Sequence, residues 1–471
     1  MKEEKENENE NILITSDDIE QMESDNKEEK YTTKEKIIYI LKGISSIISS
    51  IFHIFGYYSI WALGFTTTYL ISFRWHYNKN LDYSYSYCFI PLINISFSLT
   101  APIGGYFEDK YGGKKSIILS NSFLCFSFLI MYFSRSIYLD FILMLLNGFS
   151  ISIGFNITKK NACSFFMNKK ALICSIINIF PNLFCIALIM YNEVFILNFD
   201  LRYPMHGLPF YEEKVFINYQ KFILFEIGLL IFTCIASLLF YYQNDPKETI
   251  KFGFNEKAKN EEKDNANNAI DKIEKSKKKV SKKLKIQKAI KDKRTIRLII
   301  MAFLFLPTIN LINNNLRMDD SLYFLFGVII NIIGILSCLI FGLIGDLIQF
   351  RILFTVLSAL LSLTAYYYVK NFYGEFTFLL MPIFISFIYN GFNIIFDSHI
   401  MKVYGMDYFI EIWGVIRASG AIIQIFGIIF NFSLDIKSPG YRIIYGITGV
   451  FSLISLGLGL FEKDDKFDYN N

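Results

Sequence analysis

GGYFEDKYGGKK, residues Gly104 to Lys115, is a short polar stretch between two long apolar runs. The run PLINISFSLTAPI precedes it, and SIILSNSFLCFSFLIMYF follows it. Glycine adopts backbone conformations that other residues avoid, so Gly105, Gly112 and Gly113 suit a tight turn. The stretch therefore predicts a hairpin between two helices that are apolar enough to cross a bilayer.

The composition favours a membrane protein. Of the 471 residues, 53% are hydrophobic and 17% aromatic, and the mean hydropathy of +0.35 is too high for a soluble protein of this size. A helix of about 20 apolar residues spans a bilayer. Twelve such runs occur, at 44–72, 85–106, 116–134, 137–158, 171–191, 222–242, 297–316, 322–344, 352–369, 376–400, 412–434 and 441–461. The sequence predicts an all-α membrane protein with twelve transmembrane helices.

A basic polar linker divides the twelve runs into two sets of six. Residues 247–297 include 18 lysines and arginines, and such loops stay on the cytoplasmic side of a membrane. Because the number of spans is even, both termini are expected on that side, and no nucleic-acid partner is expected for the linker. The expected parts are a disordered tail at 1–43, a six-helix bundle at 44–242, a cytoplasmic linker at 243–296, a second six-helix bundle at 297–461 and a cytoplasmic tail at 462–471.

The opening stretch has a second copy in the other half. Gly105 to Lys115 joins the second and third runs, and Gly342 to Arg351 joins the eighth and ninth. Both copies read Gly, three residues, Asp, and a basic residue five or more positions later. Repetition at the same place in each half indicates two related bundles.

The first copy resembles motif A of the major facilitator superfamily, G-x-L-a-D-r-x-G-r-k. The matching residues of the two copies are Gly105, Asp109, Lys110, Gly112 and Lys114, and Gly342, Asp346 and Arg351. The resemblance in topology covers residues 44–461. It implies a 6+6 fold with pseudo-twofold halves, and it implies that this cluster latches the halves in the outward-open state.

Elementary chemistry suggests how such a latch works. Gly105 lets neighbouring helices approach closely. Asp109 lies at the end of the second span, where its carboxylate is expected to accept hydrogen bonds from the N-terminus of a neighbouring helix.

A second segment resembles the oxalate/formate and monocarboxylate porters, whose pattern reads G-x-G-x-x-Y/N followed by W-F-P-x-K-R-G-L-A. The corresponding residues here are Gly148, Gly154, Asn156, Phe165, Phe166, Lys169, Lys170 and Leu172. The resemblance implies a carrier of small organic anions. Porters of that branch often hold the anion with a basic residue in the eighth span, but 322–344 contains no charge.

Polar residues near the midpoints of the first, fourth, seventh and tenth spans are candidates for substrate contact, because carriers of this kind bind near the midplane. The candidates are Tyr57, Tyr58, Asn147, Asn310, Asn390 and Asn393. The alternative is hydrogen bonding between helices, which polar side chains in membranes often provide.

Charged residues inside spans are costly and are therefore functional candidates. The candidates for proton coupling are His53, Glu226, Asp397 and His399, and Arg417 is the candidate for anion binding. Arg417 is expected to pair with Asp397 when the site is empty, either as a switch or as a permanent structural pair. Asp140, near a helix end, is expected to be solvated.

The sequence thus predicts a secondary transporter that works by alternating access on a small organic anion such as a monocarboxylate, with proton coupling. The alternatives are a carrier of an amino acid, a sugar or a drug-like compound, and a membrane sensor that transports nothing. The four histidines are scattered and no CxxC pair occurs, so no enzymatic activity, cofactor or metal is expected. We expect a monomer among membrane lipids, in the plasma membrane or an organelle membrane.

Overall fold

The computed structural model describes residues 33–82, 85, 88–191, 213–245, 248, 274–315, 320–370, 375–433, 439–463 and 465. The tail at 1–32 and most of the linker therefore lie outside the described residues. Every long element in the described part of the chain is a helix.

The described helices form two sets of six, with one further described helix between them. The first set is α2 (Thr33–Tyr77), α3 (Phe89–Tyr111), α4 (Gly113–Phe133), α5 (Ile137–Phe165), α6 (Lys170–Tyr191) and α7 (Glu213–Phe240). The linker contributes α10 (Glu274–Lys291). The second set is α11 (Lys293–Asn315), α12 (Asp320–Ile344), α13 (Phe350–Lys370), α14 (Glu375–Val403), α15 (Phe409–Ser433) and α16 (Pro439–Gly459), with the short η3 (Met406–Tyr408) before α15.

The predicted all-α transmembrane fold is confirmed. Eleven helices among the described residues are long and apolar enough to span a membrane, and α11 takes the place of the remaining expected span. Several helices differ from their expected bounds, and α7 begins at Glu213 rather than residue 222. α2 begins at Thr33 rather than residue 44, and α5 continues to Phe165 rather than ending at 158.

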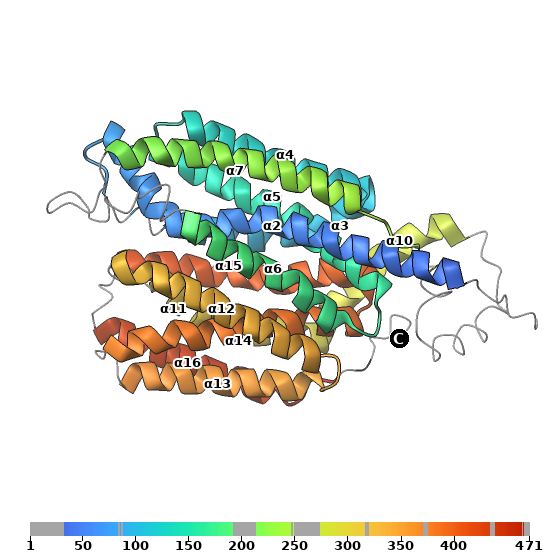
Figure 1. Ribbon diagram of the computed structural model, residues 1–471. Coiled ribbons are helices and arrows are strands. Elements are labelled where there is room, and N and C mark those ends of the chain that lie inside the picture. Colours follow the sequence, from blue (N-terminus) through green and yellow to red (C-terminus); the bar gives the residue numbers. More distant parts are fainter. Residues whose placement is uncertain are drawn as a thin grey trace, which may run out of the picture.

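The two sets lie side by side with their helices roughly aligned (Figure 1). α2 to α7, coloured blue to green, form one half, and α11 to α16, coloured gold to red, form the other. Across the boundary, α3 packs against α15 and α6 packs against α12. We call the end that carries the two motif turns, at residue 112 and residues 345–349, the motif side; α10 lies there as well. The opposite end is the far side.

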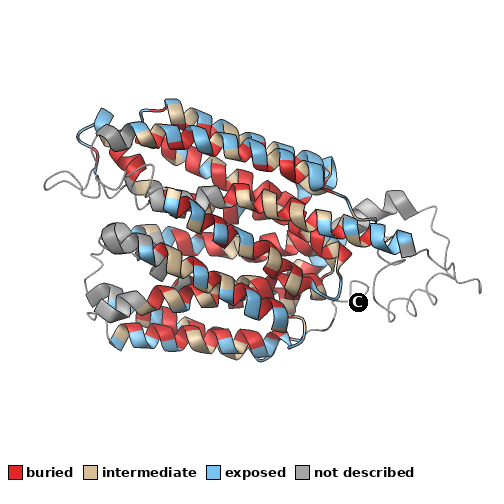
Figure 2. Cartoon of the chain, viewed as in Figure 1, coloured by how far each residue is buried: buried red, intermediate tan, exposed pale blue. Residues whose placement is uncertain are grey.

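The outer faces of the helices are apolar although they are exposed, as expected for a protein surrounded by lipid. Buried residues face the interior of the bundle, while the outer faces are exposed (Figure 2). Large apolar side chains such as Phe133, Leu239 and Leu363 are on those outer faces, with 71%, 72% and 64% of their surface exposed. Lipid tails solvate such faces, so the helices are held together by close packing and polar contacts instead of a hydrophobic driving force.

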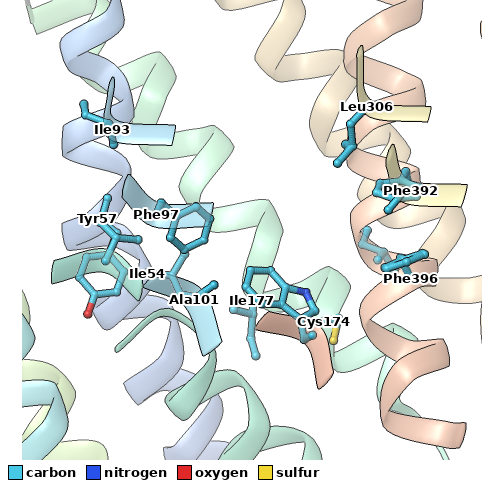
Figure 3. Packing of buried hydrophobic residues seen from close by; sticks show 14 of the residues in the cluster. Ile54, Tyr57, Ile93, Phe97, Ala101, Cys174, Ile177, Leu306, Phe392 and Phe396 are labelled. Atoms are coloured by element: carbon cyan, nitrogen blue, oxygen red, sulfur yellow. The ribbon is translucent and has the colours of Figure 1, made fainter. Parts of the chain in front are cut away.

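One continuous core connects the halves. Figure 3 shows part of it, with Ile93, Phe97 and Ala101 on α3, Cys174 and Ile177 on α6, and Leu306, Phe392 and Phe396 in the second half. Because large side chains from both halves share this core, separating the halves at this level requires repacking aromatic side chains.

Glycine is required at two kinds of position in the motif copies. Gly112 ends α3 with φ of +80°, a conformation that favours glycine. Gly342 lies against α6 of the other half, where a Cβ atom would come within 2.3 Å of Ser175 Cβ. A side chain at position 342 would therefore push the two halves apart.

Asp140 is not solvated as expected. It is fully buried at the start of α5 and forms a two-pronged ion pair with Arg74 of α2. Arg74 also donates to the backbone carbonyls of Met131 and Ser134 at the end of α4. The guanidinium thereby ties three helices of the first half together on the far side.

Candidate functional site

A buried ion pair joins the two halves. Lys159 of α5 donates to Asp397 Oδ2 of α14 at 2.8 Å, and the two side chains are only 2% and 6% exposed. The indole N–H of Trp413 on α15 donates to Asp397 Oδ1 at 2.7 Å. Both carboxylate oxygens are therefore engaged, one by each half of the molecule.

The pairing residues occupy equivalent places in the repeat. α5 and α14 are each the fourth helix of their set, and each has 29 residues. Lys159 lies as far from the start of α5 (137 to 159) as Asp397 lies from the start of α14 (375 to 397). The pseudo-twofold relation thus brings opposite charges together from equivalent positions.

The expected pair between Arg417 and Asp397 is wrong. Arg417 lies one helical turn beyond Trp413 on α15, and its Nη2 donates weakly to Tyr389 Oη at 3.4 Å. Its guanidinium carbon is 5.8 Å from the ring centre of Phe97 and 5.9 Å from that of Trp413. Over the part of the chain that the structure describes, no carboxylate lies within salt-bridge distance of Arg417, which is half-buried.

Sequence reasoning missed Lys159 because the fourth span was expected to end at residue 158. The helix continues for seven more residues, so this lysine lies inside the bundle rather than in a loop. The signal was available, since a lysine directly next to an apolar run is a candidate intramembrane charge.

The candidate asparagines lie in different surroundings. Asn390 is at the boundary between halves, where it accepts from Asn182 Nδ2 of α6 at 3.4 Å and donates to the Ser386 carbonyl at 3.0 Å. Asn393 is half-buried on the same helix. Asn147 is fully buried in α5, and its Oδ1 has no hydrogen-bond partner among the residues described. The side chains of Tyr58 and Asn310 lie outside the described part of the structure.

His53 lies away from the boundary between halves. Its Nε2 donates to the Gly154 carbonyl at 3.2 Å, and its Nδ1 accepts from Asn121 Nδ2 at 3.4 Å. One donor and one acceptor satisfy a neutral imidazole. The adjacent Tyr57 is buried as well and bonds to Ser120 Oγ at 2.5 Å. Together these groups form an internal network of the first bundle.

His399 faces the interior of the second bundle. Its ring stacks on Phe350 at 3.9 Å, and its Nε2 is 3.3 Å from Glu462 Oε1, which also accepts from Arg294 Nε at 2.6 Å. Burial raises the pKa of Glu462, but His399 and Arg294 outweigh that effect and hold the pKa below its usual range. Glu226 is fully buried in α7 near Cys185, within the first bundle.

The second motif copy forms a helix cap across the boundary. Asp346 accepts hydrogen bonds from the backbone amides of Ala171 and Leu172, at 3.1 and 3.0 Å, at the start of α6. Lys402 of α14 is 3.2 Å from the same carboxylate. A carboxylate at a helix N-terminus satisfies free amides and interacts favourably with the helix dipole.

The first motif copy uses a different partner. Lys282 of α10 donates to both oxygens of Asp109, at 2.7 and 2.6 Å, and lies 2.9 Å from Glu411 Oε1 of α15. The contact with a helix N-terminus expected for Asp109 is therefore found at Asp346, and Asp109 binds a lysine of the linker.

The remaining motif residues lie around these contacts. Lys110 is 5.5 and 5.1 Å from the rings of Tyr106 and Tyr111, and Lys114 lies over Tyr241 at 6.0 Å. Arg351 is exposed at the start of α13. Gly105 is packed against α15, where a Cβ would come within 2.7 Å of the Glu411 side chain.

Further contacts close the boundary on this side. Lys170 Nζ donates to the Met401 carbonyl at 2.9 Å, and Ser175 Oγ donates to the Cys338 carbonyl at 2.5 Å. These polar contacts between the halves lie between the motif side and the middle of the bundle. The structure is therefore closed on the motif side.

Solved structures with similar architecture share this arrangement of helices. One is the proton:xylose symporter XylE bound to 6-bromo-6-deoxy-D-glucose, with 12% identity over 89% of this chain and 94% of that chain, and a TM-score of 0.63. Another is the human organic anion transporter MFSD10, with 12% identity over 89% and 99% of the chains and a TM-score of 0.60. The inward-open xylose transporter XylE from E. coli matches with 12% identity over 88% and 94%, and a TM-score of 0.59.

This chain has the major facilitator fold. The similarity covers both halves and nearly the full length of the solved structures, so the 6+6 architecture expected from the motif is confirmed. No protein-family model and no curated protein sequence matches the chain. The resemblance to the monocarboxylate and oxalate/formate porters is not decided by these structures.

Proposed function

We propose that this protein is a secondary transporter that moves a small organic anion by alternating access. The observation that carries the proposal is the charge balance between the halves. Lys159 neutralises Asp397, while Arg417 has no carboxylate partner among the described residues and lies beside the aromatic rings of Phe97 and Trp413. A guanidinium in that position binds a carboxylate in a two-pronged geometry.

The fold supports this reading, because the solved structures of similar architecture include an organic anion transporter and a proton-coupled symporter. In the proposed cycle the anion reaches Arg417 from the far side while the motif side is closed. The halves then rock about the bound anion, which requires the Lys159–Asp397 pair to separate. We propose Asp397 as the proton-coupling residue, because it is a carboxylate inside a span and loses its cation partner when the halves rock.

The motif side is proposed to face the cytoplasm, because α10, the described helix of the basic linker, lies on it. Protease added to sealed vesicles tests the orientation. The linker at 247–297 should resist protease from the non-cytoplasmic face, and cleavage from that face alone would overturn the proposed orientation.

Transport by purified protein in proteoliposomes tests the function. Labelled pyruvate, lactate, amino acids and sugars should be offered with and without a pH gradient, and a carboxylate is expected to accumulate faster when the gradient is present. Arg417→Lys keeps the charge but loses the fork of donors, and should weaken anion affinity about tenfold. Arg442→Lys, at an exposed position of α16, is the matched control.

The outcomes separate the alternatives. Unchanged affinity of a correctly inserted Arg417→Lys protein for every transported anion would remove Arg417 from the site. Uptake of xylose or glucose in place of carboxylates would favour the second candidate, a sugar carrier. The specific observation behind that candidate is the amide pair of Asn182 and Asn390 at the boundary between halves, since amides bind hydroxyl groups as both donor and acceptor.

A further inference from the structure

Three aromatic rings meet at the boundary between the halves. Phe97 of α3, Phe155 of α5 and Trp413 of α15 form a triangle with ring centres 5.5, 5.9 and 6.1 Å apart. Phe97 and Trp413 are buried, with 3% and 7% of their surface exposed. Two rings belong to the first half and one to the second, so the triangle opens only when the halves separate.

The triangle lies between the two charged parts of the site. Lys159 is four residues beyond Phe155 in the direction of the motif side, and its Nζ lies 4.8 Å from the Phe155 ring. Arg417 is four residues beyond Trp413 in the direction of the far side. One helical turn is about 5.4 Å, so the rings separate the Lys159–Asp397 pair from Arg417 by a thin apolar layer.

Trp413 belongs to both the layer and the ion pair. Its ring centre lies 5.9 Å from that of Phe97 and 6.1 Å from that of Phe155, while its indole N–H donates to Asp397. A hydrogen bond to an ionised acceptor is stronger than one between neutral groups. This bond fixes the orientation of the indole, and that orientation closes the triangle.

We propose that Phe97, Phe155 and Trp413 form the motif-side gate of the substrate path, and that Trp413 is the positioning residue that ties this gate to the Lys159–Asp397 ion pair. The inference rests on the proposed transport function, since a gate presupposes a path. The Trp413–Asp397 hydrogen bond lies within the second half, so the indole moves away from Phe97 and Phe155 together with Asp397, in the same step in which Asp397 separates from Lys159.

Native cysteines report on the gate without any knowledge of the substrate. Cys174 of α6 and Cys338 of α12 are fully buried at the boundary between the halves, where Ser175 Oγ of α6 donates to the Cys338 carbonyl. Cys185, further along α6, is buried near Glu226 inside the first bundle. The experiment is alkylation of the full-length protein in proteoliposomes by N-ethylmaleimide, with the rate at each cysteine followed by mass spectrometry.

Trp413→Phe keeps an aromatic ring but removes the N–H donor. Alkylation of Cys174 and Cys338 should become about tenfold faster, because the charge-assisted hydrogen bond to Asp397 no longer holds the ring at position 413 against Phe97 and Phe155. Cys185 should react at the wild-type rate. Trp75→Phe is the matched control, since Trp75 lies at the far-side end of α2 next to Lys79, and it should alter none of the three rates.

A spectroscopic measurement keeps the proposal testable if labelling is slow. In a protein that carries Trp61→Phe and Trp75→Phe, Trp413 is the only tryptophan. Asp397→Asn should then shift the fluorescence emission of Trp413 and increase its quenching by acrylamide.

Unchanged labelling of Cys174 and Cys338 in Trp413→Phe would overturn the proposal. An equal rise at Cys185 would also overturn it, because it would indicate general loosening. If labelling changes as expected but the transported solute is not an anion, the anion specificity of the proposed function fails while the gate stands.

Discussion

The two copies of the motif carry the same aspartate and use it differently. Asp346 binds backbone amides at the start of α6, which belongs to the other half, and its side chain is 11% exposed. Asp109 binds the side chain of Lys282, which belongs to the linker, and is 47% exposed. One contact is made by the two bundles themselves, and the other depends on a third segment.

The difference matters for how the motif side opens. Backbone amides at a helix start cannot move unless the whole helix moves, so the Asp346 contact breaks only when the halves rock. Lys282 is a flexible side chain that also pairs with Glu411 of α15, so it can release either carboxylate while the bundles stay in place. The first copy is therefore the adjustable contact and the second the rigid one.

The largest expected effect comes from the rigid contact. Asp346→Ala removes the cap of α6 and the partner of Lys402, and should destabilise the closed protein by about 2–3 kcal/mol. The measurement is thermal unfolding in detergent, in which the midpoint should fall clearly. Asp407→Ala, at an exposed position in η3 close to the same end, is the control. Equal unfolding midpoints for Asp346→Ala and Asp407→Ala would contradict the assignment of the second motif copy as the rigid contact.

A smaller effect is expected for the adjustable contact. Lys282→Gln leaves Asp109 and Glu411 without their shared cation, but all three side chains keep some solvent contact. The expected loss of stability is therefore about 1 kcal/mol. Lys288→Gln, on an exposed position of α10, should change nothing. A loss as large as that of Asp346→Ala would show that the linker holds the motif side as firmly as the helix cap does.

Asp109→Asn should have a smaller effect again, because Lys282 keeps Glu411 as a partner. Expression and membrane insertion should stay at the wild-type level, while transport slows less than about tenfold, as expected for a surface ion pair worth about 1 kcal/mol or less. Initial uptake rates in proteoliposomes, normalised to inserted protein, provide the measurement. Wild-type rates in the variant would exclude a role for this carboxylate in the transport cycle.

The smallest expected effect concerns solution conditions. Burial lowers the pKa of Lys282, but Glu411 and Asp109 outweigh that effect and raise it above its usual range. Because the pKa is raised on folding, the contribution of Lys282 to stability is fully present at neutral pH and is lost only as the pH rises past the raised value. The stability difference between wild type and Lys282→Gln should therefore be the same at pH 7 and pH 8, and should shrink at 1 M salt, where screening acts within about 3 Å. A strong change between pH 7 and pH 8 would contradict the assignment.

Local patterns in the sequence determined most of the architecture. The apolar runs specify the spans because length and hydropathy alone decide whether a helix crosses a bilayer. Gly112 specifies the first turn, since its positive φ favours glycine. The repeated Gly-xxx-Asp pattern predicted two related halves, and the solved structures of similar architecture bear this out.

The partners of the charged residues were decided only by the tertiary structure. The sequence favoured Asp397 with Arg417, because their helices are neighbours in the chain, but Asp397 pairs with Lys159, which is 238 residues away. The side chains that meet depend on how each helix is rotated and on how the two halves pack, and hydropathy carries no information about either. A buried carboxylate takes the cation that can reach it with good geometry, so the pair at the centre of this protein follows from the assembled halves rather than from any local stretch of the chain.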